Sequence, residues 1–376
     1  TANAAPALDP RFSPDGELIA YVQADEIWLV PAVGGPARQL THGAHAAGRT
    51  HGLADYIAQE EMDRQQGYWW SPQGDWIAFE EVDESHIPLY HIVHQGKDFE
   101  DAPVEEEHRY PFAGKANPHV RLGVIPTAGD QVTWLDLGPE PDIYLARAGW
   151  LPDGRPWAQV ENREQTSLDL LIFDPHTGQA QRLLHETSAV WINLHDMFHP
   201  LKEGAYAGGF IWGSERTGFR HLYLYDAAGN LVRPLTGEPY DAGEWQVDEL
   251  CAVDEGRGLV YFTASKDSPL EHHLYAVSLN GGAAQRITQQ PGTHMVTLDH
   301  RLRQFVDLYD SLESPPSASL RLLEDGALLH TLYANDDPRL ERLQLQPPQL
   351  VSLLNRHGDT LYGMLYRPPA AFGNGP

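Results

Sequence analysis

Residues 11–41 read RFSPDGELIAYVQADEIWLVPAVGGPARQLT, and this stretch decides the fold. It contains a Ser-Pro-Asp-Gly turn, an apolar strand, a strand with the sequence IWLV, a Gly-Gly turn and a polar strand that ends in Leu-Thr. Asp-Gly and Gly-Gly supply the positive φ angles that tight hairpins need. The stretch therefore predicts a small antiparallel sheet of about four strands.

The same pattern recurs along the chain. Its opening returns as WWSPQGDWIAF at 69–79 and as WLPDGRPWAQV at 150–160. Its second half returns in segments that start at Leu168, Leu222 and Leu274, with a spacing of roughly 50 residues. One such sheet cannot bury both of its faces, so neighbouring sheets must stack around an axis, and we expect an all-β fold of the β-propeller type. The hairpins of a β-sandwich are the alternative interpretation.

Three segments depart from this pattern. Residues 54–66 (ADYIAQEEMDRQQ) lack strand alternation and are rich in helix formers, so we expect a short helical insertion between sheets. Residues 100–125 are charged and Pro-rich before they return to a strand, which indicates a long excursion. After the Pro-rich segment 343–350, residues 351–369 alternate as a hairpin around an Asn-Arg-His-Gly-Asp turn.

The charge balance excludes several classes of partner. The chain has 376 residues with 26 Lys+Arg and 53 Asp+Glu, which gives a formal net charge of −27. Such a chain repels phosphate backbones and anionic lipid, so we expect neither nucleic acid nor a membrane as a partner. No apolar run is long enough for a transmembrane helix. The N-terminus has no Met and no signal-peptide pattern, and we interpret the sequence as a piece of a longer gene product.

Known catalytic and metal-binding motifs are missing from the sequence. No serine lies in a G-x-S-x-G pattern, and HExxH, EF-hand and Walker motifs are absent. Cys251 is the single cysteine and has acidic neighbours, which disfavour a reactive thiolate. His272 and His273 are adjacent, so on a strand they point to opposite faces. We predict no cofactor and no metal.

Two clusters remain as candidate sites. Glu60 and Glu61 are adjacent in the helical insertion, and two carboxylates can hold one ammonium group through charge-assisted hydrogen bonds. From the residues alone, a solvated helix face is the simpler interpretation, and adjacency does not show the separation that glycoside hydrolysis needs. His195 and Asp196, in VWINLHDMFHPL (190–201), are candidates for the lining of a pocket at the mouth of a propeller. The same aromatic and Arg-rich stretches also suit a sheet core.

Several segments, in order and over nearly the full length, resemble the dipeptidyl peptidase IV group of the prolyl oligopeptidase family, particularly its bacterial members and the dipeptidyl peptidase 8/9 branch. They are IAQEEMDRQQGYWWSPQGDWIAFEEVDES (57–85), RYPFAGKANPHVRLGV (109–124), VWINLHD (190–196), SERTGFRHLYLY (214–225), VYFTASKDSPLEHHLY (260–275) and YGMLYRPP (362–369). The first segment is the most specific, because many propellers have Trp-Ser-Pro-x-Gly turns.

The resemblance implies a propeller of about eight blades, incomplete here, that caps an α/β-hydrolase domain. On this basis residues 1–345 form the propeller and residues 346–376 form a linker and the start of the hydrolase domain. The implied activity is that of a serine exopeptidase that releases N-terminal dipeptides with Pro or Ala in second position. The family's double glutamate, here Glu60 and Glu61, binds the substrate's α-amino group, and its distance from the nucleophile sets the position of the cut.

The resemblance also implies what this chain lacks. The family's catalytic Ser, Asp and His lie in the hydrolase domain, beyond Pro376, so we expect the chain alone to be inactive. Its substrate-binding arginine has no assigned counterpart, and Arg49 is a weak substitute. The implied partners are peptides with a free N-terminus, the protein's own C-terminal hydrolase domain and, because family members commonly dimerise, a second copy in a homodimer. The implied compartment is a bacterial periplasm or cytoplasm. The alternatives are a non-catalytic propeller that acts as an interaction scaffold, and a related oligopeptidase or acylaminoacyl peptidase.

Overall fold

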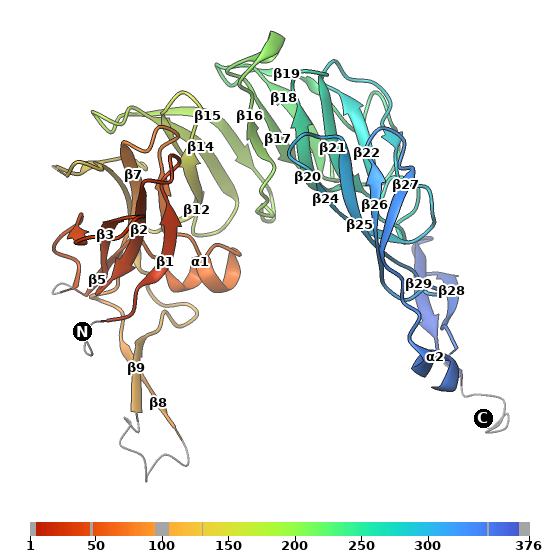
Figure 1. Ribbon diagram of the computed structural model, residues 1–376, viewed down its shortest axis with the longest axis horizontal. Helices are drawn as coiled ribbons and strands as arrows, with labels where there is room; N and C mark the ends of the chain where they lie inside the picture. The colour runs from red at the N-terminus through yellow and green to blue at the C-terminus, as the bar shows by residue number, and fades with distance from the viewer. Residues whose placement is uncertain (1–4, 46–47, 95–104, 130, 344–345, 368–376) are drawn as a thin grey trace. The chain divides into compact units, whose positions relative to one another are not determined.

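The computed structural model describes residues 5–45, 48–94, 105–129, 131–343 and 346–367 (Figure 1). As predicted, these residues are nearly all β. The helices whose bounds are described are α1 (Tyr56–Glu61), α2 (Pro338–Leu343) and the 3-10 turn Gly204–Tyr206. Among the described residues no helix is long and apolar enough to cross a membrane. The chain divides into two compact units, Thr1–Leu194 and His195–Pro376.

The first unit contains three antiparallel sheets. The first sheet has the order β1-β2-β3-β4, the second has the order β11-β10-β7-β5 with β6 also paired to β7, and the third has the order β12-β13-β14-β15. Their bounds are β1 (Leu8–Phe12), β2 (Leu18–Gln23), β3 (Glu26–Pro31), β4 (Arg38–Gln39), β5 (Arg49–His51), β6 (Tyr68–Trp70), β7 (Trp76–Asp83), β10 (His119–Pro126), β11 (Thr133–Trp134), β12 (Ile143–Trp150), β13 (Pro156–Asn162), β14 (Ser167–Phe173) and β15 (Ala180–Thr187). The meander order β1 to β4 agrees with the strands predicted for residues 11–41.

A separate two-stranded hairpin extends from the second sheet. It consists of β8 (Leu89–Val93) and β9 (Glu105–Arg109), which pair antiparallel from Leu89 opposite Arg109 to Val93 opposite Glu105. This hairpin occupies part of the predicted excursion. Residues 100–104 of that excursion lie outside the described residues.

The second unit contains three antiparallel sheets as well. Each of them has four strands that follow one another in chain order. Their strands are β16 (Phe198–Pro200), β17 (Phe210–Ser214), β18 (His221–Tyr225), β19 (Leu231–Pro234), β20 (Val247–Asp254), β21 (Leu259–Ala264), β22 (His273–Ser278), β23 (Gln285–Arg286), β24 (Thr293–Leu298), β25 (Gln304–Asp310), β26 (Ser317–Leu322) and β27 (Leu328–Tyr333). The hairpin predicted in the C-terminal segment is present as β28 (Gln349–Leu354) and β29 (Thr360–Leu365).

The Pro-x-Gly turns have one geometry in the three sheets of the first unit. Gly16, Gly74 and Gly154 have φ angles of 75°, 76° and 86°. The N–H of each glycine donates to the carbonyl three residues earlier, at distances of 2.9, 2.9 and 3.0 Å. The positive φ explains why glycine stands at this point of every repeat.

The cores lie between successive sheets. In the first unit one cluster joins Ile27 and Leu29 of the first sheet to Ile77 and Phe79 of the second. Another joins the second sheet to the third, and two further clusters join the fourth sheet to the fifth and the fifth to the sixth. Each sheet thus buries apolar side chains against a neighbour, which is the stacking that the repeat predicts.

Candidate functional site

Helix α1 carries the predicted acidic pair and is built from very few residues. Asp55 is its N-cap, and one carboxylate oxygen accepts from the N–H groups of Ile57 at 2.8 Å and Ala58 at 3.2 Å. Ala58 and Met62 are buried against Ala146 of β12. A helix of six residues is not stable alone, so this cap and this packing hold it in place.

The helix is shorter than the predicted insertion, 54–66, for a local reason. Met62 is its C-cap, and the next residue, Asp63, has a φ of 51°. The left-handed conformation of Asp63 cannot continue a right-handed helix. The rest of the insertion returns to the sheet as a loop.

The two ends of this insertion meet. Leu53 and Gln66 form an isolated antiparallel bridge. Next to it, a Cβ atom at Gly67 would lie only 2.3 Å from the carbonyl carbon of Leu53. Only glycine allows the two chain segments to approach this closely.

A buried arginine fixes the returning segment. The Nη1 atom of Arg64 donates to Glu80 at 2.6 Å and to the carbonyl of Gln66 at 2.7 Å. The Nη2 atom donates to the carbonyl of Leu145 in the third sheet at 2.8 Å. Burial raises the pKa of Glu80 to about 7, and the guanidinium of Arg64 acts in the opposite direction. Arg64 therefore connects the insertion to two sheets at once.

The acidic pair lies at the end of α1 and is exposed. Both Glu60 and Glu61 have exposed side chains. An interaction with the hydroxyl of Tyr110 raises the pKa of Tyr56 at the start of the helix, and the two glutamates raise it further. Glu60 follows Tyr56 by four residues on the helix, so the two side chains share one face of α1.

Aromatic rings connect this helix to the base of the β8–β9 hairpin. Tyr56 packs edge-on against Tyr110 with ring centroids 5.2 Å apart, and Tyr110 packs against Phe112 at 4.8 Å. Tyr90 of β8 contacts Phe112 at 5.7 Å. The neighbourhood of Glu60 and Glu61 thus combines two anions with partly exposed rings, a combination that suits a cationic group with apolar substituents.

The other predicted site residues belong to different surroundings. His195 is buried in the second unit, its Nδ1 accepts from the N–H of Met197 at 3.1 Å, and its ring packs on Trp212. Burial, with a smaller contribution from Arg220, lowers the pKa of His195 to about 4, so it is neutral at pH 7. Asp196 is exposed. The pocket lining that we predicted for His195 and Asp196 remains a prediction.

Arg49 and the histidine pair are engaged within the sheets. Arg49 lies on β5 and donates from Nε to Asp83 of β7 at 2.9 Å. His273 is fully buried, whereas His272 is partly exposed and bonds Asp248. This agrees with the predicted opposite orientations of the two histidines. Among the described residues, no group of three or more His, Cys, Asp or Glu is arranged to hold a metal ion.

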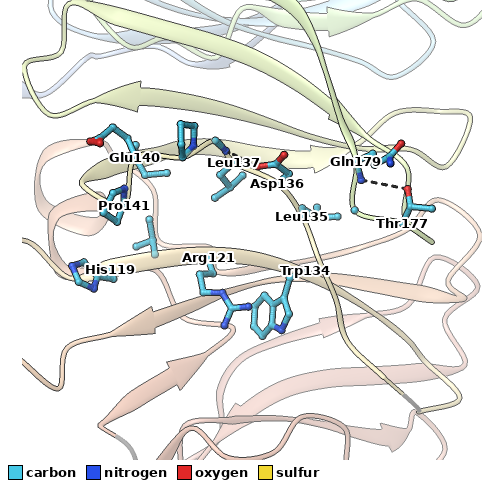
Figure 2. Close-up of a pocket in the computed structure, with 15 residues that line it drawn as sticks. His119, Arg121, Trp134, Leu135, Asp136, Leu137, Glu140, Pro141, Thr177 and Gln179 are labelled. Atoms are coloured by element: carbon cyan, nitrogen blue, oxygen red, sulfur yellow. Dashed lines mark hydrogen bonds between the residues drawn. The ribbon is translucent and has the colours of Figure 1, made fainter.

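A pocket of about 650 Å³ lies elsewhere in the first unit, between β10, β11 and the chain that leads into β12 (Figure 2). The guanidinium of Arg121 lies over the ring of Trp134 at 3.6 Å and donates to Glu81 at 3.1 Å. His119 and Glu140 line the same pocket (Figure 2). Glu60 and Glu61 do not line it.

These observations define the class of protein: a chain of stacked antiparallel sheets with a short acidic helix inserted in the second sheet. Residues 1–316 match the family model described as the dipeptidyl peptidase IV (DPP IV) N-terminal region. The chain therefore belongs to this family.

Individual relatives support the assignment. The chain is 30% identical to human dipeptidyl peptidase 8 and 28% identical to a probable dipeptidyl peptidase 4 of Aspergillus flavus, in each case over 96% of this chain. It covers 49% and 48% of these proteins, so it spans about half their length. The crystal structure of Porphyromonas gingivalis dipeptidyl peptidase 4 has the same fold, with a TM-score of 0.85, 23% identity and coverage of 97% of this chain and 51% of that one.

Sequence reasoning did not identify the residues that hold the acidic helix. Arg64 lies in the quoted segment 57–85, but its partner Glu80 follows 16 residues later, on another strand. The aromatic contact between Tyr56 and Tyr110 joins residues that are further apart still. The one local signal was the motif Glu-Glu-Met-Asp-Arg, in which a basic residue follows the acidic pair.

Proposed function

We propose that this chain is the substrate-recognition region of a serine-type dipeptidyl peptidase that releases N-terminal Xaa-Pro or Xaa-Ala dipeptides, with Glu60 and Glu61 binding the α-amino group of the substrate. The observation that carries the proposal is the position of the pair on α1. Both side chains are exposed, and the segment that follows the helix is held by the hydrogen bonds of Arg64 to Glu80 and to the carbonyl of Leu145. Family membership supports the dipeptidyl peptidase class.

The chemistry of the pair suits this role. An exposed pair of carboxylates costs little when it is empty, because water solvates both charges. A protonated α-amine has three N–H donors and can bridge both carboxylates. The net charge of −27 also attracts cationic peptides from a distance. The proposal assigns bond cleavage to a Ser-His-Asp triad in the C-terminal domain that accompanies this region.

The proposal is tested by kinetics on the gene product that carries this chain. Glu60→Gln combined with Glu61→Gln should lower kcat/KM for Gly-Pro-p-nitroanilide at least ~100-fold, since each hydrogen bond between charged groups contributes about 1.5–3 kcal/mol. Glu106→Gln with Glu107→Gln, an exposed acidic pair on β9, is the matched control and should leave kcat/KM unchanged.

Three other results would redirect or overturn the proposal. Equal cleavage of the free and the N-acetylated substrate would indicate an oligopeptidase or acylaminoacyl peptidase. A gene product that hydrolyses neither substrate would favour the interaction scaffold instead. Unchanged kinetics in the double Gln variant would remove the amine-binding role from Glu60 and Glu61.

A further inference from the structure

The recurring turn places an aromatic side chain at one position in three successive sheets. Phe12 ends β1, Trp70 ends β6 and Trp150 ends β12. Each directly precedes the Ser-Pro or Leu-Pro of its turn. Because the three turns have the same geometry, these side chains occupy equivalent places in the first, second and third sheets of the first unit.

The three aromatic residues meet at one groove of about 420 Å³, which is also lined by Arg11, Pro14, Gln66, Trp69 and Pro72. The indoles are held in place. Trp150 donates from its Nε1 atom to the carbonyl of Trp69 at 3.0 Å, and both rings pack on the core between the second and third sheets. Trp70 packs on the core between the first and second sheets. Rigid, partly exposed rings bind with little loss of conformational entropy.

Phe12 is the part of the groove that folding does not explain. Phe12 is 64% exposed, and none of the described core clusters contains it. An exposed phenylalanine in the same groove as two fixed tryptophans and two prolines supplies apolar contact area of the kind found in binding surfaces.

Two hydrogen-bond donors in the groove, the guanidinium of Arg11 and the indole N–H of Trp69, indicate what kind of ligand it can bind. Arg11 is the one charged residue in its lining. Its Nε atom donates to Asp9 at 2.9 Å, and within the described part of the chain its two Nη atoms have no hydrogen-bond partner. The indole N–H of Trp69 also has no partner among the described residues. Arg11 pairs with Asp9 through Nε, so its free Nη N–H groups can still donate to a carboxylate of a ligand in this groove.

We propose that this groove binds an extended, proline-containing peptide segment that carries an acidic residue. Aromatic-lined grooves recognise polyproline II helices because the proline rings stack on the aromatic faces and the ligand is already extended. In this groove the prolines lie on Phe12, Trp70 and Trp150. The indole N–H of Trp69 donates to a peptide carbonyl, and Arg11 binds the carboxylate. The site needs no free N-terminus, so it is separate from the amine-binding pair.

The test is a binding titration by fluorescence anisotropy on the 376-residue chain. The probe is a fluorescein-labelled, N-acetylated peptide Pro-Pro-Glu-Pro-Pro-Glu-Pro-Pro. We expect saturable binding, with affinity about tenfold weaker after Phe12→Ala. Arg11→Gln should abolish the preference for this peptide over the analogue with Lys in place of Glu. An analogue with Gly and Ser in place of Pro should bind about tenfold more weakly than the probe.

Matched controls separate the groove from general effects. Met295→Ala removes an exposed apolar side chain elsewhere, and Arg339→Gln changes an arginine that pairs with an aspartate two residues earlier, as Arg11 does. Both controls should bind as the parent chain does, and thermal unfolding should show all variants to be folded. Glu60→Gln with Glu61→Gln should also bind normally, which keeps this result independent of the proposed function.

Three outcomes would overturn the proposal. One is equal binding of the Pro and the Gly-Ser peptides. Another is unchanged binding by the Phe12→Ala and Arg11→Gln variants. The third is binding of a cello-oligosaccharide to the groove without binding of the peptide, which would assign the aromatic surface to a sugar.

Discussion

At the scale of the residue, a buried histidine joins the first sheet to the second. The Nδ1 atom of His51 lies 2.9 Å from Glu26 of β3, and its Nε2 atom lies 3.0 Å from Glu81 of β7. Burial opposes the charge of His51, but the hydrogen bonds that its ring donates to both glutamates, together with their negative charges, outweigh it and raise its pKa. Burial likewise opposes ionisation of the two glutamates, and hydrogen bonds from His51 outweigh it and lower their pKa values.

We expect His51 to make stability depend on pH. A histidine whose pKa is raised on folding stabilises the protein fully below its unfolded pKa, near 6.5, and this contribution is lost as the pH rises through the folded value. His51→Gln should therefore destabilise most at pH 5.5, by about 2 kcal/mol, and less at pH 9. Urea unfolding of both proteins at the two pH values measures this. His300→Gln, at an exposed histidine, should show no such trend, and an equal loss for His51→Gln at both pH values would contradict the prediction.

Glu161 differs from His51 in having no hydrogen-bond partner for its carboxylate, although it is fully buried. Burial raises its pKa from 4.5 to about 7, and a weaker interaction with the side chain of Gln165, which falls short of a hydrogen bond, acts in the opposite direction. A carboxyl group whose pKa is raised favours folding in its protonated form, so stability falls as the pH rises from 4.5 towards 7.

Glu161→Gln should remove this loss. We expect the variant to be more stable than the parent chain by ~2 kcal/mol at pH 8 and equally stable at pH 4. Glu164→Gln, at an exposed position three residues later, is the control. A gain at pH 4 as large as that at pH 8 would show that titration of Glu161 is not the cause.

These residues show where sequence reasoning ends. The turns at Gly16, Gly74 and Gly154 were predictable because the positive φ is a property of a few adjacent residues. The contacts of His51 were not, because Glu26 and Glu81 lie 25 and 30 residues away in sequence. Only the stacking of two sheets brings these side chains together, and the repeat does not specify which side chains meet.

At the scale of the element, the insertion that carries α1 depends on the close approach of its two ends. We expect Gly67→Ala to be destabilising by about 2–4 kcal/mol, because the added methyl group would overlap the backbone of Leu53. Thermal unfolding measures the loss, and hydrogen exchange should show faster exchange in α1. Gly256→Ala is the matched control, since a Cβ atom there meets its nearest neighbour at 3.5 Å. If the amides of α1 exchange as slowly in the Gly67→Ala variant as in the parent chain, the stability of the helix does not depend on this close approach.

The elements also show what the sequence pattern can and cannot predict. Hairpins with alternating residues, such as β28–β29, were found from sequence. The β8–β9 hairpin was not, because the strand Glu105–Arg109 has the sequence EEEHR and no apolar alternation. Helix α1 was predicted too long because helix propensity does not detect the left-handed Asp63. The amine-binding assignment of Glu60 and Glu61 came from family resemblance, since nothing in their spacing distinguishes them from a solvated pair.

At the scale of the whole molecule, the net charge of −27 acts against folding through repulsion between the many acidic residues. Salt screens this repulsion over about 10 Å at 0.1 M. We therefore expect the midpoint of thermal unfolding to rise by ~2 °C when NaCl is increased from about 20 to about 300 mM. Differential scanning calorimetry at pH 7.5 measures the shift. A decrease with salt would indicate that attractive ion pairs, rather than repulsion, dominate.

The bridge between Leu53 and Gln66 has a consequence for how such proteins diverge. The intervening dozen or so residues leave the sheet and rejoin it at nearly one point, so the exposed part of the insert, apart from buried Arg64, can change without altering strand register. Under the proposed role of Glu60 and Glu61, a substrate with a different terminal group would then require changes only in the exposed part of this insert. The same junction offers protein engineers a site at which a foreign recognition loop can be grafted.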